Sequence, residues 1–136
     1  MDLRSLAAKD IMTRDITVIS PKEKVTIAEI MMIRKNIGGL PVISPETQEI
    51  IGMLTQRDIQ LSRSTIGTHV FHVDDIYSRN PIVGKETDPL PEIIKKMVDH
   101  NIERIPITDT QNKVIGIIVM KDIIHTLGNY FNSQDP

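Results

Sequence analysis

The sequence predicts an α+β fold, similar to an α/β sandwich, made of two copies of one β-α-β-β-α unit. The segment "GMLTQRD" at 52–58 returns as "GIIVMKD" at 116–122, and "MMIRKNIGGLPVI" at 31–43 aligns with "KMVDHNIERIPIT" at 96–108. Self-similarity of this kind indicates a repeat architecture. One such unit cannot bury both faces of its sheet, so a second copy would supply the missing layer. The core must be aliphatic, because the chain has no Trp and only 3% aromatic residues.

Each repeat begins with a short extended segment that leads into a helix. The extended segments are "ITVIS" at 16–20 and "PIVGK" at 81–85, and both follow copies of the pattern "DIM/Y-[ST]-R". Apolar residues at helical spacing then predict helices over roughly 21–36 and 89–101.

The expected helix starts have recognisable cap residues. Ser20, Pro21 and Glu23 have the arrangement of a capping box with proline at the first helical position. Asp88 and Pro89 take the same parts in the second repeat.

Two strands and a closing helix complete each repeat. The strands are "GLPVI" with "EIIGMLT" in the first copy and "RIPIT" with "KVIGIIV" in the second. A polar turn separates the members of each pair, which predicts a hairpin with a longer loop. The closing helices are expected to begin near Gln56 and Met120. The domain prediction is therefore repeat 1 at 8–63, a linker at 64–72, repeat 2 at 73–128 and a frayed tail at 129–136.

Composition narrows the possible functions. The chain has 136 residues, 40% of them hydrophobic and 25% charged, a net charge of −2 and no Cys. The lack of Cys removes disulfides, thiolate metal sites and a cysteine nucleophile, and it suits a reducing compartment. The scattered basic residues do not form the basic face that nucleic acid requires. With no apolar run long enough for a membrane span or signal peptide, a cytoplasmic protein is expected.

The pair Thr55 and Asp58 raises the main functional question. Thr-x-x-Asp matches a capping box, which explains both residues without any ligand. The same helix N-terminus also favours phosphate, while an ionised Asp58 can accept hydrogen bonds from the two vicinal hydroxyls of a ribose. In the second copy Val119 replaces the threonine and Asp122 is retained. The hydroxyl is therefore dispensable for the fold of one repeat, which weakens a purely capping role for Thr55.

With "LPVI" and "IPIT" at matching separations, these motifs resemble a tandem pair of cystathionine β-synthase (CBS) domains, a Bateman module, over about residues 8–127. The resemblance implies two repeats related by a pseudo-twofold axis and two clefts between them. In many members these clefts bind AMP, ADP, ATP or S-adenosylmethionine as regulatory ligands and do no chemistry on them. The expected protein is therefore a sensor that signals to a partner protein, not an enzyme, and has no catalytic cofactor. The alternative is a ligand-free module for protein interaction or dimerisation.

The resemblance also assigns residues to the two clefts. In the family each cleft combines the Thr/Asp turn of one repeat with the pre-proline segment and first strand of the other. Arg104 would supply a positive charge for phosphate, and the second cleft, which lacks the hydroxyl and the arginine, is expected to bind more weakly. The first cleft is expected to contain Thr55, Asp58, Arg104, Ile82, Val83, Ile105 and Pro106; the second is expected to contain Asp122, Thr17, Val18, Gly38, Gly39, Leu40 and Pro41. For Arg104 the alternative is a surface charge paired with Glu103 or Asp99, and for the apolar positions it is core packing.

The first long helix has more apolar residues than one buried face needs. Ile27, Ile30 and Met31 stand where the second repeat has charged side chains. Such a face predicts an interface, and the resemblance favours a homodimer. Burial under the N-terminal segment 1–10 is the alternative.

A metal site and an enzyme active site are not expected. His69 and His72 are three residues apart in an extended segment, which places them on opposite faces, although Asp74 and Asp75 lie nearby. No P-loop motif, nucleophile or acid–base pair is evident.

Overall fold

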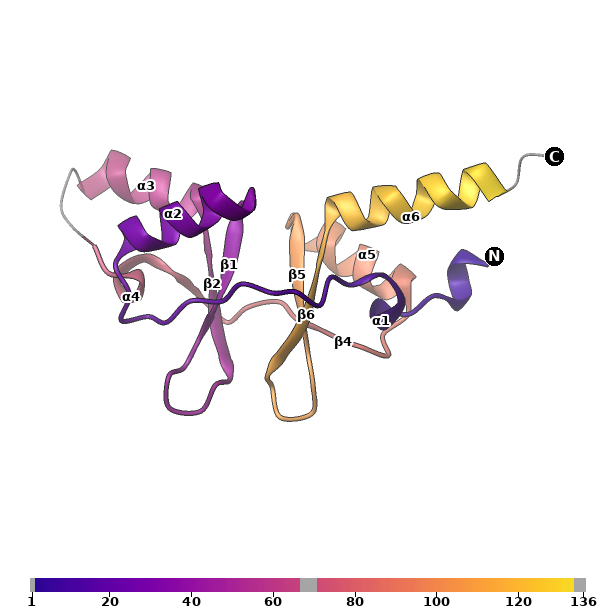
Figure 1. The fold of residues 1–136 in the computed structure, drawn as a ribbon, viewed down its shortest axis with the longest axis horizontal. Coiled ribbons are helices and arrows are strands. Elements are labelled where there is room, and N and C mark those ends of the chain that lie inside the picture. Colours follow the sequence, from indigo (N-terminus) through magenta and orange to yellow (C-terminus); the bar gives the residue numbers. More distant parts are fainter. Residues whose placement is uncertain (1, 67–70, 134–136) are drawn as a thin grey trace. The chain divides into compact units, whose positions relative to one another are not determined.

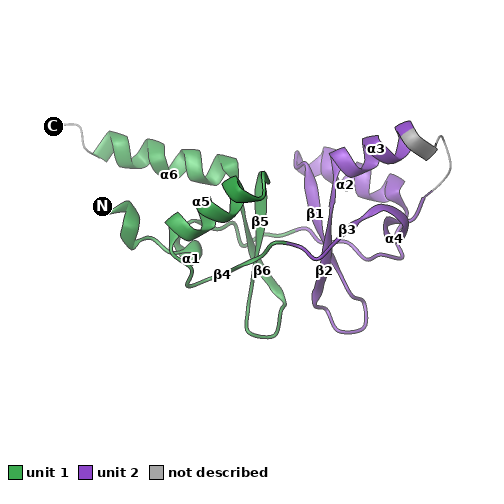
Figure 2. Cartoon of the chain, turned by 180° about the vertical axis from the view of Figure 1, so that it is seen from behind, with its two compact units in different colours: residues 1–16, 82–136 green, residues 17–81 purple. Residues whose placement is uncertain are grey.

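The computed structural model describes residues 2–66 and 71–133, and it divides the chain into two compact units (Figure 2). Unit 2 is residues 17–81, and unit 1 combines residues 1–16 with 82–136. Each unit contains one small three-stranded sheet with helices, which confirms the predicted α+β fold of two repeats.

Unit 2 is built around the hairpin of β1 and β2. Its elements are α2 (Val25–Lys35), β1 (Gly39–Ile43), β2 (Ile50–Thr55), α3 (Gln56–Ile66), α4 (Val73–Ile76) and β3 (Ser78–Arg79). The strand order is β1-β2-β3, and both pairings are antiparallel. Ile19 adds a parallel bridge to Val42 at the other edge. The hairpin loop lies at the end of the strands away from α2 and α3 (Figure 1).

Unit 1 repeats this plan around the hairpin of β5 and β6. Its elements are the 3₁₀ helix η1 (Leu3–Ser5), α1 (Ala8–Ile11), β4 (Gly84–Lys85), α5 (Leu90–Asp99), β5 (Arg104–Thr108), β6 (Val114–Val119) and α6 (Met120–Ser133). The order is β4-β5-β6, with β4 parallel and β6 antiparallel to β5. Thr13 forms an antiparallel bridge to Ile117, so it corresponds to β3 of unit 2.

Each unit has its own largely aliphatic core, as the composition requires. In unit 2 the fully buried side chains include Met32, Leu40, Val42, Leu54 and Val73. In unit 1 they include Ala8, Ile93, Ile105, Ile107 and Ile118. Burial of each such large aliphatic side chain contributes about 1.5–3 kcal/mol to the stability of its unit.

Each unit includes the first residues of the other sequence repeat, 73–81 in unit 2 and 8–16 in unit 1, and a glycine accommodates each of these docked segments. A Cβ on Gly52 of β2 would collide with the ring of Tyr77 and the carbonyl oxygen of Ser78. A Cβ on Gly116 of β6 would lie 2.6 Å from Sδ of Met12. The repeated glycine of "IIG" and "VIG" is therefore explained by the close approach of the segment that crosses each strand.

The long helix of the first repeat starts later than its cap residues predict. We expected a start at Pro21 with a Ser20 capping box, but α2 begins at Val25 and has no side-chain cap. Ser20 Oγ accepts a hydrogen bond from the N–H of Lys22 in a turn instead. The reason is long-range pairing: the N–H of Val25 donates to the carbonyl of Phe71, so the backbone before α2 is held by the segment that leads into the second repeat.

The second long helix shows the same shift on a smaller scale. Pro89, expected at the first helical position, is the N-cap of α5, and Asp88 instead accepts a hydrogen bond from the N–H of Lys85. The N–H of Leu90 pairs with the carbonyl of Leu6.

The closing helices are longer than expected. Helix α3 runs into the predicted linker 64–72, and α6 runs to Ser133 inside the predicted tail 129–136. His69 lies outside the described residues. Within 2–66 and 71–133, none of the helices has the length and apolar character that a membrane span needs.

Candidate ligand-binding site

The turn between β2 and α3 holds Thr55 and Asp58 in a reciprocal capping box. The N–H of Thr55 donates to Asp58 Oδ2 at 2.9 Å, and the N–H of Asp58 donates to Thr55 Oγ1 at 3.1 Å. Both side chains are half-buried. The capping interpretation of the motif is confirmed.

Capping leaves part of the hydrogen-bonding capacity of both side chains for a ligand. Thr55 uses an acceptor lone pair of its hydroxyl, so its hydrogen can still be donated. Asp58 uses Oδ2 for the cap, while Oδ1 accepts the hydroxyl of Ser78 at 3.3 Å. An ionised carboxylate has about four lone-pair positions, so Asp58 can accept two further donors, as a ribose diol would require. The cap and the ligand contact are therefore chemically compatible.

The turn between β6 and α6 has the same design with one group missing. The N–H of Val119 donates to Asp122 Oδ2 at 2.8 Å, and the hydroxyl of Thr13 donates to Asp122 Oδ1 at 3.4 Å. Because Val119 has no hydroxyl, the N–H of Asp122 lacks the acceptor that Thr55 provides in unit 2. Helix α6 forms nevertheless, which supports the argument that the threonine hydroxyl is not required for the fold.

The backbone closes both turns in the same way. The N–H of Gln56 donates to the carbonyl of Gly38 at 2.9 Å, and the N–H of Met120 donates to the carbonyl of Glu103 at 3.0 Å. Each acceptor is the residue just before the first strand of its hairpin. The pre-strand segment and the turn of one repeat are thus held together.

The remaining residues predicted for the first cleft lie in unit 1. Arg104 begins β5 with one-fifth of its side chain exposed, and it forms a loose ion pair with Glu103 at 3.7 Å. The structure thus contains the Glu103 pairing named as the alternative role of Arg104. Ile105 and Pro106 are buried in β5, while Ile82 and Val83 are half-buried before β4. Thr55 and Asp58 belong to unit 2, and the structure fixes each group inside its own unit.

The residues predicted for the second cleft are divided in the opposite sense. Asp122 lies in unit 1, and its six expected neighbours lie in unit 2. These are Thr17, Val18 and Gly38, which are half-buried, and Gly39, Leu40 and Pro41, which are buried in β1.

The expected interface residues of α2 differ in exposure. Ile27 and Ile30 are 39% and 45% exposed, whereas Met31 packs against the core of unit 2. The N-terminal segment, the alternative cover for these residues, belongs to unit 1, where the N–H of Leu90 donates to the carbonyl of Leu6.

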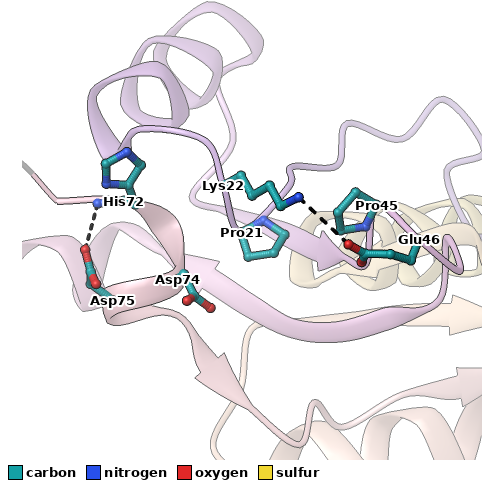
Figure 3. A pocket seen from close by; sticks show the side chains of 7 residues that line it. All are labelled: Pro21, Lys22, Pro45, Glu46, His72, Asp74 and Asp75. Carbon is teal, nitrogen blue, oxygen red and sulfur yellow. Dashed lines mark hydrogen bonds and ion pairs between the residues drawn. The ribbon is translucent and has the colours of Figure 1, made fainter.

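A hollow of about 600 Å³ in unit 2 lies outside all of these groups (Figure 3). It is lined by Pro21, Lys22, Pro45, Glu46, His72, Asp74 and Asp75. The N–H of His72 donates to Asp75 Oδ2, and Lys22 faces Glu46 at 3.8 Å. In the described part of the chain, no group of three or more His, Asp or Glu side chains is placed to hold a metal ion.

Comparison with known proteins identifies the class. The family model for the CBS domain matches residues 8–62 and 73–129. The chain is 32% identical over 118 residues to the CBS domain-containing protein YhcV of Bacillus subtilis, covering 86% of this chain and 82% of YhcV. It is also 31% identical over 114 residues to the inosine-5′-monophosphate dehydrogenase of Thermoplasma acidophilum, covering 84% of this chain and 22% of the dehydrogenase.

Solved structures agree with this assignment. The CBS domain pair of protein MJ0100, in complex with 5′-methylthioadenosine and S-adenosyl-L-methionine, superimposes with a TM-score of 0.84 at 25% identity, covering 92% of this chain and 98% of the other. The chain belongs to the CBS domain family and contains two such domains. It spans less than a quarter of the dehydrogenase that it matches.

Proposed function

We propose that this chain is a non-catalytic regulatory module that binds an adenosine-containing ligand and passes its occupancy to a partner protein. The observation that carries the proposal is the Asp58 carboxylate, which is fixed by a backbone N–H through one oxygen and still has acceptor positions for a ribose. The MJ0100 domain pair, which is similar over nearly its whole length, was solved with two adenosine derivatives, and this supports the ligand class.

In this proposal the ligand takes contacts from both repeats. Asp58 accepts the ribose hydroxyls and Thr55 donates to a phosphate or another polar 5′ group. Arg104 supplies a fixed positive charge, which favours a phosphorylated ligand. The adenine packs against the apolar residues Ile82, Val83, Ile105 and Pro106. The site around Asp122 lacks both the hydroxyl and the arginine, so we propose that it binds weakly or prefers a ligand with little negative charge.

The transmission of occupancy would require two states with different affinities for the ligand, because a ligand shifts an equilibrium only by that difference. The exposed α2 residues Ile27 and Ile30 are candidates for the contact that changes. We place them in a homodimer interface, with Met31 contributing less because it already packs against the core. A dimerisation module without a ligand is the second candidate, and the same exposed residues favour it.

Calorimetric titration tests the proposal. AMP, ADP, ATP and S-adenosylmethionine are titrated into the unaltered chain, the Asp58→Ala variant and the matched control Asp122→Ala. Loss of a charge-assisted hydrogen bond should weaken the main site by about 10- to 100-fold in Asp58→Ala, and the control should leave that site unchanged. Asp58→Asn adds a sharper arm, since it keeps an oxygen for the Thr55 N–H but replaces the ribose acceptor with a donor.

The same samples distinguish the second candidate. Sedimentation velocity with and without nucleotide reports the oligomeric state. No heat with any of the four compounds, together with a stable dimer, would reject the sensor function and support the ligand-free module.

A further inference from the structure

In each unit, the aspartate of the turn accepts a hydrogen bond from a hydroxyl group on the segment that opens the other sequence repeat. In unit 2 it comes from Ser78 on β3, which pairs with Met53 of β2. In unit 1 it comes from Thr13, whose N–H and carbonyl both pair with Ile117 at 2.9 Å. The two hydrogen bonds to Oδ1, at 3.3 and 3.4 Å, are made by different residue types in two separate units. This agreement indicates a requirement of the turn rather than a chance surface contact.

Stability alone gives little reason for these hydroxyls. The segment carrying Ser78 is already held by backbone pairing of β3 and by the ring of Tyr77, which packs over Gly52. Ser78 is exposed, and its bond is longer than the usual 2.7–2.8 Å of an O–H···O hydrogen bond. A contact of this kind contributes little to folding, but it fixes the direction of Asp58 Oδ1.

The neighbouring residue has a different role. Arg79 lies on the other face of β3, where its guanidinium stacks over Tyr77 at 4.6 Å and donates to the Tyr77 hydroxyl at 2.6 Å. It also faces Asp74 at 3.7 Å. Arg79 therefore anchors the segment, while the hydroxyl of Ser78 is left to face the turn.

We infer that Ser78 is a positioning residue of the ligand site, which orients Asp58 Oδ1 toward a ribose hydroxyl, and that Thr13 does the same for Asp122. This inference rests on the proposed function. The carboxylate is held at both ends, by Thr55 N–H through Oδ2 and by Ser78 through Oδ1. Its rotation is therefore restricted before the ligand arrives, which lowers the entropic cost of binding.

A thermodynamic cycle tests the inference. AMP and 5′-methylthioadenosine, each with its 2′-deoxy counterpart, are titrated into the unaltered chain and Ser78→Ala. The variant should bind the ribose-containing probes about three- to tenfold more weakly. The cost of removing the 2′-hydroxyl should shrink by a similar factor, because Ser78 acts through the group that accepts that hydroxyl. A purely structural role would weaken both members of each pair equally and would overturn the inference.

Two variants complete the design. Ser78→Thr should keep the affinity of the unaltered chain, since threonine occupies the equivalent position in unit 1 and makes the same contact. Thr13→Ala should leave the Asp58 site unchanged, and a loss there as large as in Ser78→Ala would contradict the assignment. If the unaltered chain binds neither probe, the proposed function fails with the inference; if it binds both and Ser78→Ala does not alter the cycle, only the inference fails.

Discussion

The turn after β2 and the turn after β6 have the same backbone hydrogen bonds but different side chains. In both, an aspartate accepts the N–H three residues before it through Oδ2 and a hydroxyl from the docked segment through Oδ1. Only the turn of unit 2 has a threonine hydroxyl as well. The turn after β6 therefore serves as an internal control for the turn after β2. A feature present in both copies serves something that the two turns share, whereas Thr55, present in one, needs a local reason.

Substitution of the two glycines that contact the docked segments should give the largest difference in stability between the units. Gly52→Ala drives a Cβ deep into the ring of Tyr77 and the carbonyl oxygen of Ser78. Gly116→Ala meets the flexible side chain of Met12 and approaches the carbonyl oxygen of Thr13 only to 3.1 Å, which a small shift can relieve. We expect a loss of about 3 kcal/mol in the first variant and about 1 kcal/mol in the second. Amide hydrogen exchange, followed separately in β2 and β6, measures each loss in its own unit.

Gly128→Ala is the matched control for these variants. Among the described residues, no atom outside the neighbouring backbone of α6 lies within 4 Å of the added Cβ, so alanine should stabilise the helix slightly. Equal losses for Gly52→Ala and Gly116→Ala would show that the two segments are docked with the same rigidity, contrary to the contacts described above.

Exchange of the turn residues should have a smaller effect. Thr55→Val removes the acceptor of the Asp58 N–H and should lower the stability of unit 2 by about 1 kcal/mol. Val119→Thr adds the acceptor to unit 1 and should raise its stability by up to the same amount. Thermal unfolding of both variants without ligand checks this, and the double variant should show additive changes. If Thr55→Val left the unfolding curve unchanged, the hydroxyl would have no capping role, and its retention would depend on the ligand alone.

Substitutions in the two hairpin loops should give the smallest difference in stability between the units, and only at acidic pH. Backbone N–H donation, first from Lys113 and less from Gln111, lowers the pKa of Asp109 below its ordinary value against the opposing effect of burial; the nearby Lys113 and Lys85 charges also lower it. A depressed carboxyl pKa contributes stability above the unfolded-state value, and this is lost as the pH falls through the folded-state value, here below about pH 4. In Asp109→Asn the melting temperature of unit 1 should therefore fall less as the pH is lowered into this range.

The corresponding loop of unit 2 provides the comparison. It has Ser44 at the same position, whose hydroxyl donates to Glu46 and lowers the pKa of that carboxyl. Glu46→Gln should flatten only the acid response of unit 2. A change in both units from either variant would show that the loops are not independent.

Sequence reasoning succeeded where the signal was local or repeated. The duplication located both hairpins and both capped turns, because their residues lie within a few positions of one another. It failed at the start of α2, since the backbone after Ser20 is satisfied by residues near Phe71, and no local pattern reports a partner so distant. The contacts of Ser78 and Thr13 with the two aspartates were missed although the [ST]-R pattern appears in both repeats. That repetition was the signal that could have identified them.

The placement of the N-terminal segment determines the order in which the chain can fold during synthesis. Unit 2 is continuous from residue 17 to 81, so it can close before the rest has emerged from the ribosome. Unit 1 must wait, because the Thr13 contact with Asp122 joins residues 109 positions apart. Closing so long a loop is entropically costly and slow, although the finished unit 2 takes up most of that length. The segment that contains Met12 and Thr13 is therefore translated before unit 2 but pairs after it, and until β6 arrives the apolar side chain of Met12 stays in water.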